Sequence, residues 1–177
     1  MPDDLQSQIE PAQLICKAIR LPLLITDGFE ADDVIATVAE KAKNRNLKCV
    51  ISSLDKDLMQ LVEDPKVSMM NTMTHQIFDE EKLLDKFGVE PTQIRDLLAL
   101  TGDSSDNIPG IPKVGQKTAA KWLNEFENIK NIKSNADSIK GVVGDNLRGF
   151  ITDLDRNIEL VSLKRDVDLK VKFEDLL

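Results

Sequence analysis

Three short runs of consecutive apolar residues, separated by helical patterns, constrain the fold of this chain most strongly. The runs are LPLLIT at 21–26, KCVISS at 48–53 and VSMMN at 67–71. Residues 30–46 lie between the first two runs and carry apolar side chains at helical spacing, and a shorter helical segment at 55–62 follows the second run. Such alternation is typical of a parallel sheet with helices on its faces. The sequence therefore predicts an α/β fold.

Strand signals fade in the second half of the chain, where helical patterns take over. Asp79 is expected to cap one helix and Gly88 to stop it. LKVKF at 169–173 is the one further candidate strand. We therefore predict an α/β part at residues 1–90 and a mostly helical part at residues 91–177. The expected helices cover residues 4–19, 30–46, 78–88, 92–101, 117–126 and 143–166.

The acidic balance of the chain limits the partners that its bulk charge can attract. Acidic residues outnumber basic residues by 31 to 23, and the formal net charge is -8. Such a charge predicts no general affinity for nucleic acids or anionic membranes. Because no apolar run has the length of a membrane span and the first residues do not resemble a signal peptide, we predict a cytoplasmic protein without a membrane partner. Cys16 and Cys49 lie far apart, which favours buried reduced thiols over a disulfide or a zinc site.

Acidic side chains gather at three places, and two of these follow predicted strands directly. Because the carboxyl ends of parallel strands meet at one edge of a sheet, the first two groups are expected to share a crevice. The third group follows the helix predicted at 92–101. The three groups are Glu30, Asp32 and Asp33; Asp55 and Asp57; and Asp103 and Asp106.

Taken alone, each of the first two acidic groups also fits a helix start, where the helix dipole stabilises carboxylates, and Asp103 and Asp106 fit a turn before Pro109. Convergence on one crevice weakens this explanation, since crowded carboxylates raise each other's pKa unless cations neutralise them. Oxygen ligands select hard ions such as Mg²⁺ or Mn²⁺, and two such ions about 4 Å apart form an arrangement that hydrolyses phosphodiesters. A calcium-binding EF-hand starting at Asp103 is excluded, because Val114 stands where its twelfth residue must be glutamate.

Residues 101–123, TGDSSDNIPGIPKVGQKTAAKWL, predict a hairpin of two helices joined by a glycine-rich turn. The free backbone N–H groups of a helix start attract anions, and glycine lets a phosphate come close. Such a hairpin holds a nucleic-acid backbone without reading its sequence. A purely structural helical hairpin fits the same spacing equally well. A Walker A loop is excluded, because Gln116 separates Gly115 from Lys117.

Taken together, three motifs resemble the 5′ nuclease family, which contains the 5′ nuclease domain of bacterial DNA polymerase I, flap endonucleases and phage 5′ exonucleases. The motifs are GFEADDVIATVAEKA, SSLDKDLMQLV and LLALTGDSSDNIPGIPKVGQKTAAKWL. The resemblance implies a Rossmann-like core of the PIN type, followed by a helical part with a helix-three-turn-helix element. It also implies a 5′–3′ exonuclease or structure-specific flap endonuclease that works with two metal ions in replication and repair, in the bacterial cytoplasm at the nucleoid.

The resemblance further implies a role for each matching residue. Glu30, Asp32 and Asp33 match the first acidic motif, in which the first two positions serve one metal ion. Asp55 and Asp57, and then Asp103 and Asp106, match motifs that serve mainly the other ion. The hairpin matches an element that grips duplex DNA and can hold K⁺ through main-chain carbonyls. The DNA-binding positions implied are Gly110, Ile111, Lys113, Val114, Gly115, Gln116, Lys117, Thr118 and Lys121.

The implied partners are DNA with a 5′ flap, nick or 5′ end, an RNA–DNA hybrid, and a polymerase part in the same parent chain. Members of the family begin with strands that carry two further aspartates, and they have a basic arch. This chain is expected to start after those strands, so that residues 1–90 form a partial nuclease core with weak or no activity. Burial of Leu23, Ile25, Val50 and Ile51 would mark an intact sheet. Two alternatives remain open: a non-catalytic, structure-specific DNA-binding module and a stand-alone flap endonuclease relative.

Smaller features are expected to be structural. His75 lies between a predicted strand and a predicted helix and is read as a surface loop residue, whereas Trp122 is read as a core residue. Lys130, Lys133 and Lys140 form a run that fits a solvated face slightly better than an extension of the DNA contact.

Overall fold

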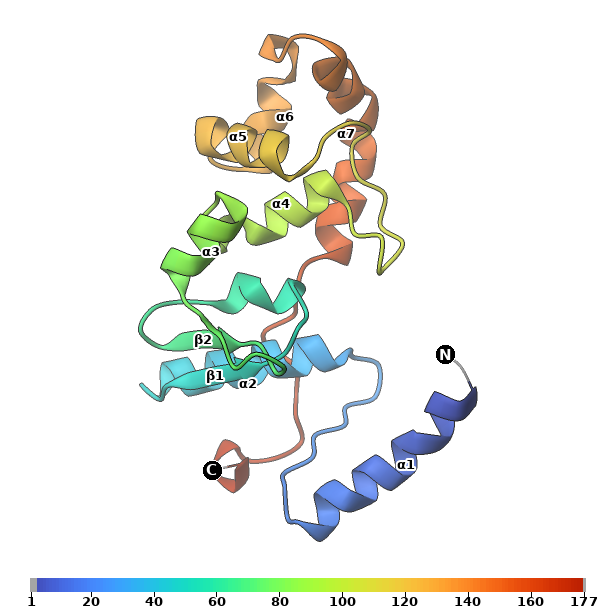
Figure 1. Ribbon diagram of the computed structural model, residues 1–177, viewed down its shortest axis with the longest axis vertical. Helices are drawn as coiled ribbons and strands as arrows, with labels where there is room; N and C mark the ends of the chain where they lie inside the picture. Colours follow the sequence, from blue (N-terminus) through green and yellow to red (C-terminus); the bar gives the residue numbers. More distant parts are fainter. Residues whose placement is uncertain (1–2, 177) are drawn as a thin grey trace.

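The second and third apolar runs pair in parallel in the computed structural model, which describes residues 3–176 (Figure 1). β1 (Cys49–Ser52) lies beside β2 (Val67–Met70), with Cys49 opposite Val67. β3 (Ile77–Phe78) pairs with β2 in the antiparallel sense, and the sheet order is β1-β2-β3. The sequence pattern places Phe78 in the following helix, and a strand of 2 residues is too short to show alternation.

The first apolar run forms no strand, so the prediction of a strand at 21–26 is wrong. A strand needs a neighbour for its backbone N–H and C=O groups, and within residues 3–176 β1 pairs with β2 alone. The run instead connects two helices as an extended segment, with Ile25 64% exposed. Of the four burial markers, Ile51 is buried, whereas Leu23, Ile25 and Val50 are exposed. The α/β part is therefore rearranged relative to the predicted sheet.

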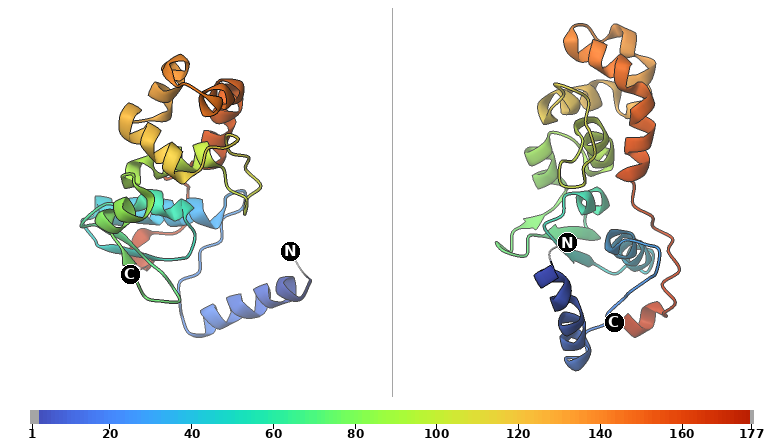
Figure 2. Two further views of the ribbon diagram at one scale, coloured as in Figure 1. Left: turned by 45° about the horizontal axis from the view of Figure 1, so that its top comes forward. Right: turned by 90° about the vertical axis from the view of Figure 1, so that its right-hand side faces the viewer.

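The two helices that flank this extended segment differ in how they pack. α1 (Asp3–Ala18) forms as predicted but stands apart from the rest of the chain in the different views (Figures 1 and 2). Its large apolar side chains, including Leu14 and Ile15, remain exposed. α2 (Ala31–Asn44) instead packs against β1 and buries Ala36 and Ala39 in the core.

The segment between the sheet and the helical part forms as its cap signals predict. Asp79 accepts a hydrogen bond from the Lys82 backbone N–H at 3.0 Å and begins the next helix, and Gly88 ends it in the left-handed conformation with φ 73°. The other short elements are of the 3-10 type; the first packs beside β2 and buries apolar side chains, and the second packs against the first. The elements of this segment are η1 (Asp57–Leu61), α3 (Glu80–Phe87) and η2 (Pro91–Gln93).

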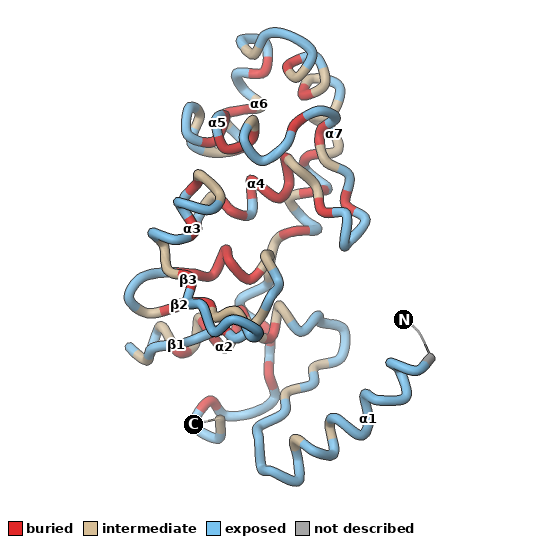
Figure 3. Tube along the Cα trace, viewed as in Figure 1, coloured by how far each residue is buried: buried red, intermediate tan, exposed pale blue. Residues whose placement is uncertain are grey.

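The helical part forms a bundle whose inward faces are buried (Figure 3). Leu100, Leu123 and Leu154, from three different helices, are fully buried in it. Trp122 also lies in the core, as predicted, and His75 lies in an exposed turn. The elements of the bundle are α4 (Ile94–Thr101), α5 (Gln116–Phe126), α6 (Ile129–Ser134), η3 (Ala136–Ser138) and α7 (Val142–Leu160).

The segment after α7 runs back to the α/β part and lies along α2 (Figure 2). The Val167 backbone N–H donates to Thr37 Oγ1 at 3.1 Å, and Val167 packs with Val34 in a small apolar cluster. The prediction of a strand at 169–173 is wrong, because these residues join no sheet among residues 3–176 and the Lys170 N–H in this segment donates to Asp168 Oδ1 instead. It ends in η4 (Phe173–Leu176).

The thiols of Cys16 and Cys49 are free, as predicted, but they are half-buried rather than buried. Burial raises the pKa of the Cys49 thiol. Among the helices of residues 3–176, none combines the length and the apolar character needed to cross a membrane.

Candidate metal centre and DNA-binding hairpin

Three carboxylates from two distant segments meet near the end of β1. Asp57 is the first residue of η1, and Asp103 and Asp106 lie on the loop that follows α4. One oxygen atom from each of the three lies within 4.8 Å of the others. The fold thus brings the second and third acidic groups together, although 46 positions separate Asp57 from Asp103 in the sequence.

An acidic hollow of about 320 Å³ extends this cluster toward α2. Five of the seven predicted carboxylates line it, so the first acidic group also reaches the same place. Asp33 does not, because its Oδ1 atom accepts a hydrogen bond from the Lys164 backbone N–H at 2.8 Å and so faces the segment after α7. The lining residues are Glu30, Asp32, Asp55, Asp57, Asp106, Asn107, Ile108 and Leu160.

Crowding of these carboxylates disfavours their charged forms. Burial, followed by the charges of Asp55, Asp103 and Asp106, raises the pKa of Asp57 to about 6, against a weaker opposing effect of Lys56. Burial and then the charge of Asp55 are likewise the main causes that raise the pKa of Asp32. A hollow with this electrostatic character favours cations.

Lys56 is a member of the site that the sequence reading does not assign. Its Nζ atom lies 2.7 Å from Oδ2 of Asp103, whose side chain is 2% exposed, and the Ser105 backbone N–H donates to Oδ1 at 2.8 Å. Burial acts to raise the pKa of Asp103, but the bonds to Lys56 and Ser105 outweigh it and hold the pKa below its ordinary value. The signal was present in the sequence, since Lys56 stands between Asp55 and Asp57.

The donors at the site fit a hard divalent cation. Asp57 Oδ1 is buried and has no hydrogen-bond partner, which leaves a charged oxygen without compensation. The converging groups offer carboxylate oxygens only, which is the ligand type that Mg²⁺ and Mn²⁺ prefer. The Lys56 ammonium already neutralises Asp103 but makes no such contact with Asp57 Oδ1.

Replacing Lys56 with glutamine is expected to destabilise the metal-free protein by about 1–3 kcal/mol, because Asp103 is left buried without its cation. Added Mn²⁺ is expected to recover part of this loss, since a bound cation neutralises the same carboxylate. Urea denaturation with and without Mn²⁺ measures both effects, with Lys66→Gln, which changes another half-buried lysine, as a matched control. A loss that Mn²⁺ does not diminish would contradict a cation site at Asp103.

The loop that joins α4 to α5, residues 102–115, is the turn of the predicted hairpin and packs tightly against the end of α4. The Asp103 N–H donates to the Ile108 carbonyl at 2.9 Å, and the Ile111 N–H donates to the Leu100 carbonyl at 3.0 Å. Asn157 of α7 is fully buried, and its Nδ2 atom donates to the Pro109 carbonyl at 2.6 Å. The position of the acidic loop is therefore set by α4 and α7 together.

The predicted DNA-binding positions divide into buried and exposed groups. Ile111 and Val114 turn their side chains into the core, so that only their backbone is available to a ligand. Gly115 is the N-cap of α5 and is exposed. Gly110 is half-buried, Thr118 is half-buried at the edge of the hairpin, and the exposed members of the set are Lys113, Gln116, Lys117 and Lys121.

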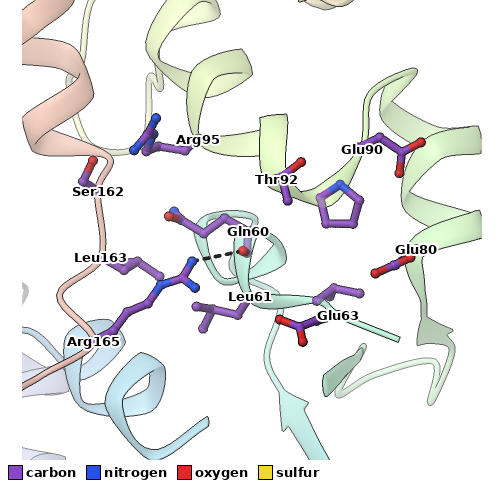
Figure 4. A pocket seen from close by; sticks show the side chains of 12 residues that line it. Gln60, Leu61, Glu63, Glu80, Glu90, Thr92, Arg95, Ser162, Leu163 and Arg165 are labelled. Carbon is purple, nitrogen blue, oxygen red and sulfur yellow. Dashed lines mark hydrogen bonds between the residues drawn. The ribbon is translucent and has the colours of Figure 1, made fainter. Parts of the chain in front are cut away.

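A further hollow, of about 440 Å³, lies between η1, η2 and the segment after α7 (Figure 4). Arg95 and Arg165 lie toward one side of it and Glu80 and Glu90 toward the other. Arg165 Nη2 donates to the Gln60 carbonyl at 3.3 Å, which fixes the returning segment to η1. The seven predicted carboxylates do not line this hollow, so it is separate from the candidate metal centre.

Comparison with protein-family models divides the chain into two matches. Residues 1–88 match the model described as the 5′-3′ exonuclease N-terminal resolvase-like domain. Residues 89–177 match the 5′-3′ exonuclease C-terminal SAM fold. These matches confirm the predicted fold class, an α/β part followed by a helical part, and the resemblance stated from the motifs.

Similar proteins carry related names. The chain is 42% identical over 175 residues to a 5′-3′ exonuclease of Aquifex aeolicus, covering 99% of this chain and 59% of that protein. It is 40% identical over 173 residues to DNA polymerase I of Mycobacterium tuberculosis, covering 95% of this chain and 19% of that protein. The flap endonuclease of bacteriophage T5, solved in a pseudo-enzyme-product complex with DNA and metal ions, matches with a TM-score of 0.78 and 28% identity, covering 88% of this chain and 57% of that chain. The chain thus spans less than two thirds of each of these proteins.

Proposed function

Since this chain belongs to the 5′-3′ exonuclease family, we propose that its acidic hollow holds divalent metal ions for the hydrolysis of DNA phosphodiesters near 5′ ends and flaps. The observation that carries the proposal is the meeting of Asp57, Asp103 and Asp106, with the oxygen atom Asp57 Oδ1 buried and without a partner. The T5 protein, which was solved with DNA and metal ions, supports the same chemistry by its similarity.

We assign the carboxylates to two ions, Mg²⁺ or Mn²⁺. Glu30 and Asp32 serve one ion, and the remaining lining and buried carboxylates, Asp55, Asp57, Asp103 and Asp106, serve mainly the other. Asp33 has a different role in this proposal, because its bond to the Lys164 N–H holds the start of α2 against the returning segment.

Bound in the hollow, such ions supply the charge neutralisation and the water activation that phosphodiester hydrolysis requires. The side chains of this chain determine where the ions lie. Asp57, with a pKa of about 6, holds a proton at acidic pH and must lose it to act as a ligand, so metal binding is expected to weaken below that pH. Lys56 keeps Asp103 charged before a metal ion arrives.

The hairpin is the proposed DNA contact. Lys117 and Thr118 lie in the first turn of α5, next to its N-cap Gly115, and backbone N–H groups at such a helix start bind phosphate without reading base sequence. We propose DNA with a 5′ flap, nick or 5′ end, or an RNA–DNA hybrid, as the substrate, and K⁺ as an ion held by the carbonyls of the hairpin.

We also propose that the boundary between the α/β part and the helical part lies near residue 90.

Relatives that are DNA polymerases extend well beyond the length of this chain. We therefore propose a polymerase part in the same parent chain, acting in the bacterial cytoplasm at the nucleoid. The coding sequence on either side of this chain tests that proposal. A polymerase reading frame that continues from it supports the proposal, and in-frame stop codons close to both ends would contradict it.

Metal binding separates the nuclease proposal from a DNA-binding module without catalysis. Isothermal titration with Mn²⁺ is expected to show binding that falls at least tenfold in Asp55→Asn and Asp103→Asn, because each change removes a charged ligand. Asp85→Asn, which changes an exposed carboxylate on α3, is the matched control. Equal binding in all variants would count against the metal centre. Mn²⁺-dependent cleavage of a 5′-flap substrate that is lost in Asp55→Asn would show activity in this chain itself.

A further inference from the structure

A lysine-lined hollow of about 530 Å³ lies between α5 and the start of α7. Lys117 and Lys121 reach it from α5, and Lys140 reaches it from the turn that precedes α7. The hydroxyl-bearing residues Thr118 and Ser138 also line it. Three lysines thus line one hollow on a chain whose formal net charge is -8.

The chemistry of this lysine-lined hollow matches a phosphodiester backbone. Its charged lining consists of three lysines and one acid, Glu125, so that it is locally cationic. Hydroxyl and ammonium donors together are the side chains that contact phosphate oxygens in protein–DNA complexes. Trp122, which also lines the hollow, is buried in the core and anchors this part of α5.

The structure separates three lysines that the sequence presents as one run. Lys133 bonds to both carboxylate oxygens of Asp155, at 2.7 and 2.8 Å, and its charge is neutralised there. Lys130 is exposed on α6 and does not line the lysine-lined hollow. Lys140 alone of the three joins the lysines of α5.

The lysine-lined hollow is continuous with the proposed DNA contact of the hairpin, because Lys117, Thr118 and Lys121 belong to both. The backbone adds to this character at two points. Gly115 and Gly141 are the N-caps of α5 and α7, neither helix start has a side-chain cap, and the space beside each glycine is open. A DNA strand bound at the hairpin would therefore meet further hydrogen-bond donors as it continues toward the start of α7.

We propose that Lys140, together with Ser138, forms a second phosphate contact for the DNA strand that the hairpin holds. This inference rests on the proposed DNA-binding function and adds a segment outside the hairpin to it. The contact is with the backbone and carries no base specificity. It lengthens the DNA footprint from the hairpin toward the start of α7.

The test measures binding rather than cleavage, so that it does not depend on the metal centre. Fluorescence anisotropy of a labelled duplex with a 5′ overhang is recorded between 50 and 200 mM KCl for the whole chain and for Lys140→Gln. The variant is expected to bind roughly 3–10-fold more weakly at low salt, with the slope of log K against log salt smaller by about 0.9, as for the loss of one phosphate contact. Two duplexes of unrelated sequence are expected to show the same loss.

The matched control is Lys130→Gln, which removes an exposed lysine outside the lysine-lined hollow and is expected to leave affinity and slope unchanged. If Lys117→Gln weakens binding but Lys140→Gln does not, the inference is overturned while the proposed function stands. If the unaltered chain does not bind either duplex, both are overturned. If inorganic pyrophosphate binds in a Lys140-dependent way but DNA affinity is independent of Lys140, the hollow takes a free anion and the inference is again overturned.

Discussion

Asp57→Asn is expected to abolish tight metal binding and, in the same protein, to increase stability when metal is absent. The buried oxygen Asp57 Oδ1 has no partner, and the neighbouring carboxylates repel its charge. The neutral amide removes this repulsion, and it also removes a charged ligand. Opposite signs in the two measurements distinguish a metal site from a structural cap, whose loss lowers stability with or without metal.

The pH dependence follows from the same group. In the folded protein the pKa of Asp57 is about 6, above the value of 3.8 expected without the fold, so the folded form binds the proton more tightly. Stability of the metal-free protein should therefore fall as pH rises from about 4 through about 6, and the loss should persist above that range. If the whole difference between the two pKa values appeared as free energy of unfolding, it would amount to roughly 3 kcal/mol. Because Asp57 is partly exposed to solvent, we expect about 1–2 kcal/mol.

Thermal denaturation at pH 5 and pH 8, with and without Mn²⁺, measures these effects. At a Mn²⁺ concentration of about 100 times Kd, the unaltered chain should gain about 2.7 kcal/mol, or roughly 5–10 °C in Tm, and Asp57→Asn should gain little. Asp85→Asn should behave as the unaltered chain does. If metal-free Asp57→Asn melts at a lower temperature than the unaltered chain at pH 8, the charge of Asp57 does not destabilise the metal-free protein and the explanation is wrong.

Gly110→Ala is expected to destabilise the protein by about 3 kcal/mol or more, which lowers Tm by roughly 6–12 °C. A Cβ atom at Gly110 would collide with the backbone carbonyl of Thr101, and backbone cannot move aside as a side chain can. Relief of the collision must displace the loop from α4, which also displaces Asp103 and the hairpin. Loss of stability should therefore come with weaker metal binding.

Gly115→Ala is the matched control on the same hairpin. A Cβ atom there meets nothing within 4 Å, and the residue has φ -101°, which alanine adopts freely. Its stability should stay within about 1 kcal/mol of the unaltered chain. Urea denaturation of both variants gives the comparison, and similar values for the two would contradict a role of the Gly110 contact in fixing the loop.

The sequence was sufficient to predict those elements whose signals are local. The cap at Asp79, the stop at Gly88 and the core position of Trp122 depend on neighbours within a turn or on helical spacing, and all three are confirmed. The strand at 21–26 was predicted wrongly, because an apolar run becomes a strand only if a partner edge accepts its backbone groups. The partner is a property of the whole fold and is absent from local composition.

The candidate site shows the same division. Asp32 and Asp57 line one hollow, as expected from the sequence, although the strand that was expected to precede Asp32 does not form. Asp33 faces away from the hollow because it accepts a hydrogen bond from the Lys164 N–H, 131 positions further along the chain. A contact between residues so far apart cannot be predicted from the sequence around Asp33. Likewise, the separation of Lys133 from Lys140 depends on Asp155, which only the packing of α7 brings into contact.

The segment that returns from α7 to α2 has a consequence for the order in which this protein is made. Thr37 and Asp33 leave the ribosome about 130 residues before the backbone groups that bond to them. At typical rates of 5–20 residues per second, this gap lasts roughly 6–26 seconds. During that time α2 carries its acidic first turn without the segment that holds it in place. The acidic hollow is therefore completed only after α7 has been synthesised, and a chain released before Lys164 would lack a fixed position for one of its walls.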